Sequence, residues 1–162
     1  MSDEQAVQSE LVAKFPFLQD KIRVARVRRI WAELLVENFA AVFEASLAMG
    51  FTYLATITGL DEGENFGAIY HMARPTGMML NLHVSVPKSN PVLQSICRRF
   101  PAAECYEREL VDLFGMKVEG LPQGPRYPLP DGWPDGQYPL RKDWRPEMLN
   151  TAAPKEGDKP NA

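Results

Sequence analysis

Residues 51–86 read FTYLATITGLDEGENFGAIYHMARPTGMMLNLHVSV, in which segments typical of strands are separated by segments typical of turns. Its apolar and β-branched residues gather in three runs of strand length. Between the runs lie two short segments, DEGEN at 61–65 and RPTG at 74–77, whose residue types favour turns. The stretch therefore predicts three consecutive strands, at about 51–58, 66–73 and 78–86.

The third run indicates how the sheet is covered. Its apolar residues alternate with polar ones, and successive side chains of a strand point to opposite faces. The apolar face carries Leu80, Leu82, Val84 and Val86, and the polar face carries Asn81, His83 and Ser85. We therefore expect other elements to cover one face of the sheet while the other face stays polar.

The residues before this stretch predict two more strands and two helices. A short helix is predicted over residues 3–14, and the β-rich runs KIRVARV and IWAELLV predict strands at 21–27 and 30–36. Asn38 is the predicted N-cap of a second helix, which ends at Gly50.

The residues after 51–86 predict two short helices and then become rich in proline. NPVLQSICRRF at 90–100 and CYERELVDLFG at 105–115 predict two further short helices, and Gly115 is the predicted C-cap of the second. Residues 122–146 then contain seven prolines, which rule out a long helix or an inner strand. We expect an extended arm in this region.

The order of these elements predicts the fold class. It is α-β-β-α-β-β-β, followed by short helices and an extended, proline-rich C-terminal arm. We therefore expect an α+β fold of two layers, with helices on one face of a mixed sheet. The predicted parts are an α+β domain at 1–118, an arm rich in proline and aromatic residues at 119–148, and a disordered polar tail at 149–162.

The composition limits the classes of function. The chain has 162 residues, 45% hydrophobic and 24% charged, as in an ordinary globular domain. Its net charge of −3 argues against nucleic acid, because phosphate binding needs a concentrated basic face. It has neither an apolar run of the roughly 20 residues that span a bilayer nor a visible secretory signal. We expect a cytoplasmic chain that reaches a membrane only through partners.

A local basic run stands out from this acidic background. Arg23, Arg26, Arg28 and Arg29 alternate with apolar residues in KIRVARVRRIW. One interpretation is a half-exposed edge strand with charged side chains. The other is a contact for an acidic protein partner or for lipid headgroups.

The sequence contains no complete catalytic or cofactor motif. His71 and His83 lie on predicted strands, where a metal pair would need a third ligand from a distant segment, and where hydrogen-bonded histidines are the simpler interpretation. Cys97 and Cys105 are too few for an iron–sulfur cluster, which needs about four ligands. Serine-nucleophile and phosphate-binding motifs are absent. We expect no catalytic residue, metal or cofactor in this chain, so a stand-alone enzyme has no constellation to act with.

The segment YERELVDLFG, residues 106–115, leaves two interpretations open. On a helix, Tyr106, Leu110 and Leu113 form an apolar stripe, and Arg108 and Asp112 are spaced as an ion pair. The charged residues then form either a solvated face or a buried network in which Arg108 organises the arm or a partner loop.

Two motifs together indicate a family. The helix contributes Glu107, Arg108, Glu109, Asp112 and Gly115, and the arm contributes Pro139, Leu140, Arg141, Lys142, Asp143 and Trp144. With FTYLATITGLD upstream, this pair resembles the signature of the 30 kDa subunit family of respiratory complex I, over about residues 20–145. The chain departs from the family where it reads Gly120-Leu121-Pro122 instead of Gly-His-Pro, so nothing that rests on that histidine carries over.

The resemblance implies a function in a complex. The spacer between the two motifs, QGPRYPLPDGWPDGQ at 123–137, looks more like the equivalent subunit of energy-converting, membrane-bound nickel–iron hydrogenases. The alternative is the 30 kDa subunit of NADH:quinone oxidoreductase itself. Such subunits carry no cofactor and dock on the large subunit, beside an iron–sulfur subunit, on the cytoplasmic side of the membrane. Iron–sulfur clusters and nickel–iron, or flavin and quinone, belong to the partners.

The arm is the predicted docking segment. Aromatic residues dominate interface hot spots, and a proline-rich chain loses little entropy when it is ordered. The predicted anchors are Tyr127, Trp133, Tyr138 and Trp144, with Arg141 and Asp143 as hydrogen-bonding groups. Two alternatives remain: a lid folded back on the sheet, with Arg141 paired to Glu107, Glu109 or Asp112, and a proline-motif adaptor for small recognition domains.

Overall fold

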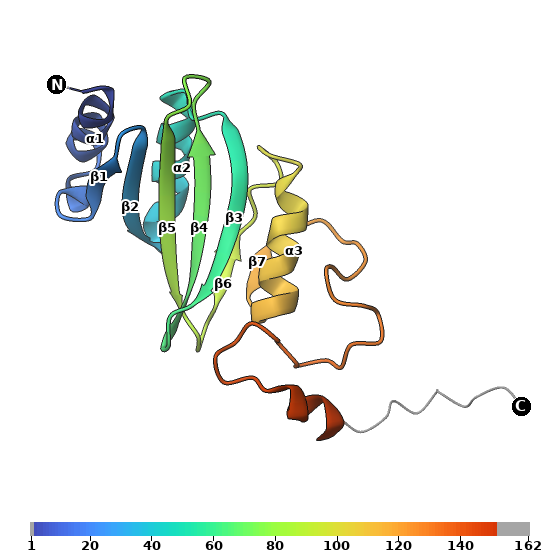
Figure 1. The fold of residues 1–162 in the computed structure, drawn as a ribbon. Helices are drawn as coiled ribbons and strands as arrows, with labels where there is room; N and C mark the ends of the chain where they lie inside the picture. The colour runs from blue at the N-terminus through green and yellow to red at the C-terminus, as the bar shows by residue number, and fades with distance from the viewer. Residues whose placement is uncertain (1, 152–162) are drawn as a thin grey trace, which may run out of the picture.

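The structure, a computed structural model, describes residues 2–151. Its centre is a five-stranded mixed sheet with the strand order β1-β2-β5-β4-β3, and α2 (Val36–Ala48) covers one face of it (Figure 1). The predicted two-layer α+β fold is confirmed. The strands are β1 Ile22–Arg26, β2 Arg29–Leu35, β3 Tyr53–Asp61, β4 Asn65–Ala73 and β5 Met79–Pro87.

The connections explain why the sheet is mixed. β1 and β2 form a hairpin, and β3, β4 and β5 form an antiparallel meander. The crossover through α2 returns the chain so that β5 runs parallel to β2, with Ile30 opposite Leu80. The predicted alternation in β5 is correct, because Leu80, Leu82 and Val84 are fully buried beneath α2 while His83 lies on the other face.

The N-terminal elements pack against the first hairpin. α1 (Asp3–Lys14) begins with a capping box between Ser2 and Gln5, and η1 (Pro16–Leu18) follows it. The second helix begins earlier than predicted. Its N-cap is Leu35 and not Asn38, because β2 leads directly into α2.

The predicted helix at 90–100 is wrong. Its first residues form β6 (Val92–Gln94), which pairs in parallel with the unpredicted strand β7 (Lys117–Glu119). The backbone N–H of Ile96 then donates to the Glu107 carboxylate at 2.7 Å, so a side chain takes the place of a helical acceptor. Contacts with β7 and with Glu107 therefore take the place of helical hydrogen bonds in this segment.

The last helix and the arm complete the described chain. α3 (Ala103–Phe114) ends at Gly115, which adopts the left-handed conformation with φ 71° that its predicted role as C-cap requires. The arm, defined here as residues 119–148, is mostly irregular and runs beside α3 (Figure 1). Residues 149–151 belong to η2 (Pro146–Thr151), and the rest of the predicted tail at 149–162 lies outside the described residues.

Candidate docking site

Glu107 joins α3 to the loop that precedes it. Its side chain is fully buried and accepts hydrogen bonds from Ser95 Oγ at 2.6 Å and from the Ile96 N–H at 2.7 Å. Cys97 Sγ also donates to it, at 3.2 Å. Burial, together with the Glu107 charge, raises the pKa of Cys97 to about 11, so this thiol stays protonated. Glu107 therefore has a structural role and lies inside a buried polar network.

Arg108 connects α3 to the start of the arm. It donates to the carbonyl oxygens of Pro122 at 2.8 Å and Pro125 at 3.2 Å, and forms an ion pair with Glu104 at 2.8 Å. The predicted pair with Asp112 is wrong, because the Arg108 guanidinium points back toward Glu104 and outward to the arm. The interpretation in which Arg108 organises the arm is confirmed.

Asp112 holds the middle of the arm through Arg126. Arg126 Nε lies 3.4 Å from Asp112 Oδ1, and Arg126 Nη1 donates to the Trp133 carbonyl oxygen at 2.7 Å. Asp112 is buried, and its Oδ2 has no hydrogen-bond partner among the described residues. The arginine, which no sequence motif singles out, therefore links the signature helix to the loop that carries Trp133.

Arg141 attaches the end of the arm to the C-terminus of α3. Its Nε donates to the Phe114 carbonyl oxygen at 2.6 Å, where the helix dipole favours a cation. The guanidinium carbon lies 4.2 Å from the ring centroid of Tyr138 and 5.1 Å from that of Phe66. The predicted pairing of Arg141 with Glu107, Glu109 or Asp112 is wrong, because a main-chain carbonyl is its acceptor.

Gly115 is needed at this joint for two reasons. Its φ of 71° is strained for residues with a side chain, and a Cβ there would collide with the Arg141 guanidinium and the Tyr138 ring. The signature glycine therefore lets the arm approach the helix end, where the Leu140 N–H donates to the Leu113 carbonyl oxygen at 3.1 Å.

Asp61 anchors the same end of the arm to the sheet. Its Oδ2 accepts a hydrogen bond from the Lys142 backbone N–H at 2.9 Å, and Lys88 Nζ lies 2.8 Å from Oδ1. Burial opposes ionisation of this carboxyl, but the hydrogen bonds from Lys88, Lys142 and Gly63 outweigh it and lower the pKa to about 2. In the sequence, Asp61 is the last residue of FTYLATITGLD, the upstream segment that resembles the family. Its position at the start of a predicted turn is the one signal that could have identified it.

The two arm tryptophans stabilise the arm itself. Trp133 Nε1 donates to the Gln137 main-chain oxygen and Trp144 Nε1 to the Gln137 side-chain oxygen, both at 2.8 Å. Their ring centroids are 6.1 Å apart. Trp133, Trp144 and Tyr138 are thus half-buried within the arm, and Tyr127 is the predicted anchor that stays exposed. That all four anchors face a partner stays a prediction.

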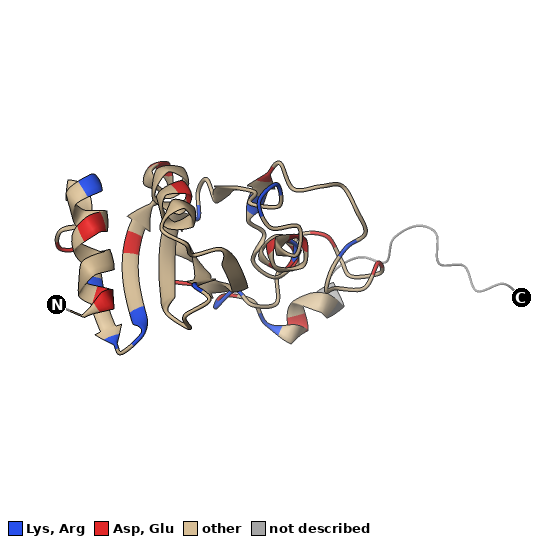
Figure 2. Ribbon diagram, turned by 90° about the horizontal axis from the view of Figure 1, so that it is seen from above, with Lys and Arg blue, Asp and Glu red and all other residues tan. Residues whose placement is uncertain are grey.

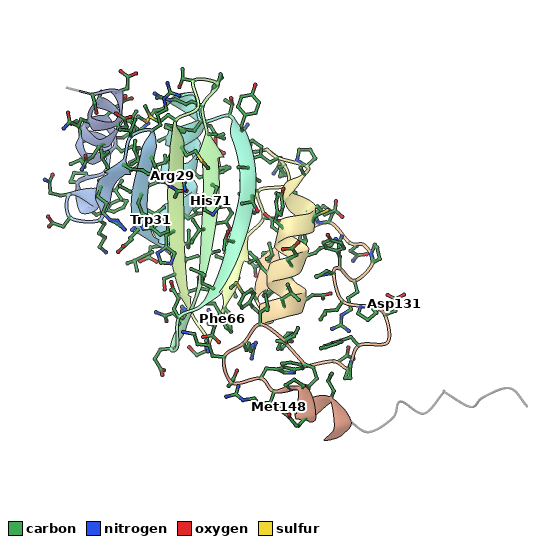
Figure 3. All side chains as sticks on the ribbon, in the orientation of Figure 1. Arg29, Trp31, Phe66, His71, Asp131 and Met148 are labelled. Carbon is green, nitrogen blue, oxygen red and sulfur yellow. The ribbon has the colours of Figure 1, made fainter. Side chains whose placement is uncertain are left out.

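Three large apolar side chains of the arm are exposed. Tyr127, Leu140 and Met148 are exposed by 44%, 52% and 39%. Leu140 also borders a groove of about 260 Å³ between β3 and α3, whose wall includes Glu109 and whose floor includes Leu110. The side chains of Lys142 and Asp143 are exposed beside it, and Pro139 is half-buried. Figure 3 shows this region, with Phe66 and Met148 labelled near the end of the arm.

The sheet histidines are hydrogen-bonded, as expected. His71 lies 2.7 Å from Asn81 Oδ1 and 3.0 Å from Thr58 Oγ1, and His83 lies 2.8 Å from Glu62 Oε1. Among residues 2–151 no group of three or more His, Cys, Asp or Glu side chains is placed to hold a metal ion. Nor does any helix in this range have the length and apolar character to cross a membrane.

Known proteins resemble this chain in sequence. The chain is 29% identical over 157 residues to the membrane-bound hydrogenase subunit beta of Pyrococcus furiosus, covering 88% of this chain and 87% of that protein. It is 35% identical over 109 residues to an NADH-quinone oxidoreductase subunit of Moorella thermoacetica, covering 65% and 72%. It is 40% identical over 96 residues to the formate hydrogenlyase subunit 5 of Escherichia coli, covering 56% of this chain but 17% of that protein.

Solved structures resemble it in fold, and a family description matches most of the chain. A trypsin-resistant fragment of Nqo5 superposes with a TM-score of 0.63 at 30% identity, covering 74% of this chain and 98% of the fragment. A chain of the membrane-bound sulfane sulfur reductase, an archaeal respiratory membrane complex, superposes with a TM-score of 0.77 over 99% of this chain and 96% of that one, at 21% identity. Residues 30–148 match the family described as the respiratory-chain NADH dehydrogenase 30 Kd subunit, and this chain belongs to that family.

Proposed function

We propose that this chain is a non-catalytic subunit of an energy-converting, membrane-bound nickel–iron hydrogenase. The observation that carries the proposal is the similarity to the hydrogenase subunit beta, which extends over 88% of this chain and 87% of the relative. The match to formate hydrogenlyase subunit 5 also supports it. There the matched region is 17% of a longer chain, so it is covalently joined to other parts of that protein.

The arm and α3 form the main docking surface for the hydrogenase-type large subunit in this proposal. Arg108, Arg126 and Arg141 hold the arm on the helix, so little further ordering is required when a partner binds. The exposed side chains of Tyr127 and Leu140 supply apolar contact area at its outer side. A neighbouring iron–sulfur subunit is the second expected partner.

Electrons pass through those partners in this proposal, and the chain itself holds no cofactor. An iron–sulfur cluster needs about four thiolate ligands. The chain has two cysteines, and Cys97 is a protonated thiol hydrogen-bonded to Glu107. The chain reaches the cytoplasmic side of the membrane through the complex.

A second candidate is the 30 kDa subunit of NADH:quinone oxidoreductase. The 35% identity to the Moorella thermoacetica protein favours it. Affinity purification from gently solubilised native membranes distinguishes the two. Nickel in the co-purifying large chain supports the hydrogenase, and a flavin-bearing partner that oxidises NADH supports the alternative.

Truncation after Gly120 tests the docking proposal. Residues 1–120 retain the sheet and all three α-helices, so far-ultraviolet circular dichroism can verify that the shortened chain folds. We expect the folded, truncated chain to lose the large subunit during affinity purification. Co-purification at undiminished affinity would contradict the proposal.

A further inference from the structure

A basic, concave site lies at the tip of the β1–β2 hairpin, and the proposed docking function does not use it. Arg26, Arg28 and Arg29 surround a hollow of about 430 Å³, and Gly77 and Met79 of the neighbouring turn and strand complete its lining. Figure 2 shows the blue arginine segments of this hairpin beside α1.

The arginines at this tip have no ion-pair partner among the described residues. Arg26 and Arg28 are exposed, and within residues 2–151 neither they nor Arg29 forms an ion pair. Glu4 reaches the tip, where its carboxylate accepts the backbone N–H of Arg28 at 2.7 Å and attracts the Arg28 charge. The exposed side chains of Arg26 and Arg28 and the half-buried side chain of Arg29 therefore gather positive charge in a chain whose net charge is −3.

Hydrogen bonds hold the backbone of the tip and one of its arginine side chains. Arg28 turns the hairpin in the left-handed conformation with φ 56°, and its backbone oxygen accepts from the Met79 N–H at 2.9 Å. Arg29 Nη2 donates to Met79 Sδ at 3.1 Å, which orients this guanidinium. Val27 projects between them with 82% of its surface exposed.

We propose that this tip, formed by Arg26, Val27, Arg28 and Arg29 with Gly77 and Met79, binds an acidic segment of a second protein partner. The cations are all arginines, whose planar fork matches a carboxylate in bidentate geometry. The hollow also has an apolar side formed by Met79 and Val27, which suits a peptide that alternates acidic and apolar residues. A lipid surface fits less well, because a single apolar side chain, that of Val27, projects from the tip.

This site is separate from the docking surface of the arm. The hairpin tip and the β4–β5 turn lie at the upper end of the sheet in Figure 1, and Asp61 binds Lys142 of the arm at the lower end. β5 has nine residues, which at about 3.3 Å per residue separate the two ends by roughly 30 Å. The chain can therefore hold two neighbours at once.

Photo-crosslinking in the native complex tests the proposal. A benzoylphenylalanine introduced at Val27 of the full-length chain is irradiated in the purified complex, and its products are identified by mass spectrometry. We expect a crosslink to a partner segment rich in Asp and Glu. Crosslinks to lipid alone, to a segment without acidic residues, or to no macromolecule would each overturn the proposal.

The second measurement compares crosslink yields after arginine charges are removed from the chain that carries benzoylphenylalanine at position 27. Loss of two charge-assisted contacts in R26Q/R28Q should lower the crosslink yield about tenfold or more. Arg98→Gln is the matched control, because Arg98 is an exposed arginine on another surface and its loss should leave the yield unchanged. Equal yields from R26Q/R28Q and from the parent chain would also overturn the proposal.

Discussion

The carboxylate of Asp61 accepts the backbone N–H of Lys142 at 2.9 Å, although the two residues lie 81 positions apart. This hydrogen bond joins the end of β3 to the Pro-Leu-Arg-Lys-Asp motif of the arm. Arg141, which donates to the Phe114 carbonyl oxygen at the end of α3, holds the same part of the arm against the domain. The two family motifs are therefore adjacent parts of one structure.

Replacement of Asp61 by Ala should destabilise the fold and detach the end of the arm. Loss of a buried, charged acceptor leaves the Lys142 N–H without its partner, which costs about 1–3 kcal/mol of unfolding free energy. Urea denaturation measures this cost, and limited proteolysis measures exposure of residues 139–145. Asp131→Ala, at an exposed position of the arm, is the control and should change neither.

The same carboxylate predicts a dependence of stability on pH. The pKa of Asp61 is about 2 in the folded chain against an ordinary value of 3.8, so its ionised form stabilises the folded state. This stabilisation is fully present above about pH 4 and is lost as the pH falls toward about 2. Urea midpoints measured across this range should fall more steeply for the parent chain than for Asp61→Asn. Parallel curves would show that Asp61 is not the responsible group.

Arg141 should not be replaceable by lysine. A lysine keeps the positive charge, but it lacks the planar group that lies between Tyr138 and Phe66 while donating to the Phe114 oxygen. We expect both Arg141→Lys and Arg141→Ala to increase hydrogen exchange of the arm amides around 138–144. Arg98→Lys serves as the control. Full protection in Arg141→Lys would mean that charge alone holds the joint.

Gly59 should not tolerate alanine. A Cβ at this position of β3 would lie 2.5 Å from Phe114 Cε2 and 2.8 Å from Leu110 Cδ2, so α3 would have to move away from the sheet. We expect Gly59→Ala to lower the free energy of unfolding by about 1–3 kcal/mol in urea denaturation. Gly132→Ala is the matched control, because a Cβ there meets no atom within 4 Å. Equal stabilities of the two variants would show that α3 does not pack as described.

The sheet could be predicted from the sequence because its signals are local. The alternation in residues 79–86 indicates which face of β5 lies under α2, although Asn81 on the other face is also buried, and Gly115 ends α3 through its own conformational freedom. The segment 90–100 is different, because its short apolar run fits a helix or a strand equally well. Residues elsewhere in the sequence favour the strand, because β7 pairs with residues 92–94 and Glu107 accepts the Ile96 N–H that follows them.

The contacts of the arm are less predictable for a related reason. Periodicity places Arg108 and Asp112 within reach of each other, but it does not say where their side chains point. Both instead find partners in the arm, through the Pro122 oxygen and Arg126. The carbonyl oxygens of Pro122 and Pro125 accept hydrogen bonds from Arg108, while Arg126 donates to the Trp133 carbonyl oxygen. Nothing in the local pattern of the sequence specifies these contacts.

The most direct test of the central claim is one substitution on the outer side of the arm in the full-length chain. Leu140→Asp places a charge at a side chain that is 52% exposed, so the fold should be retained while apolar docking is lost. Tyr53→Asp, at a side chain that is 59% exposed on β3, is the control. After affinity purification from solubilised membranes, we expect Leu140→Asp to lose the large subunit and Tyr53→Asp to retain it. Equal recovery of the large subunit with both folded variants would show that the outer side of the arm is not the docking surface.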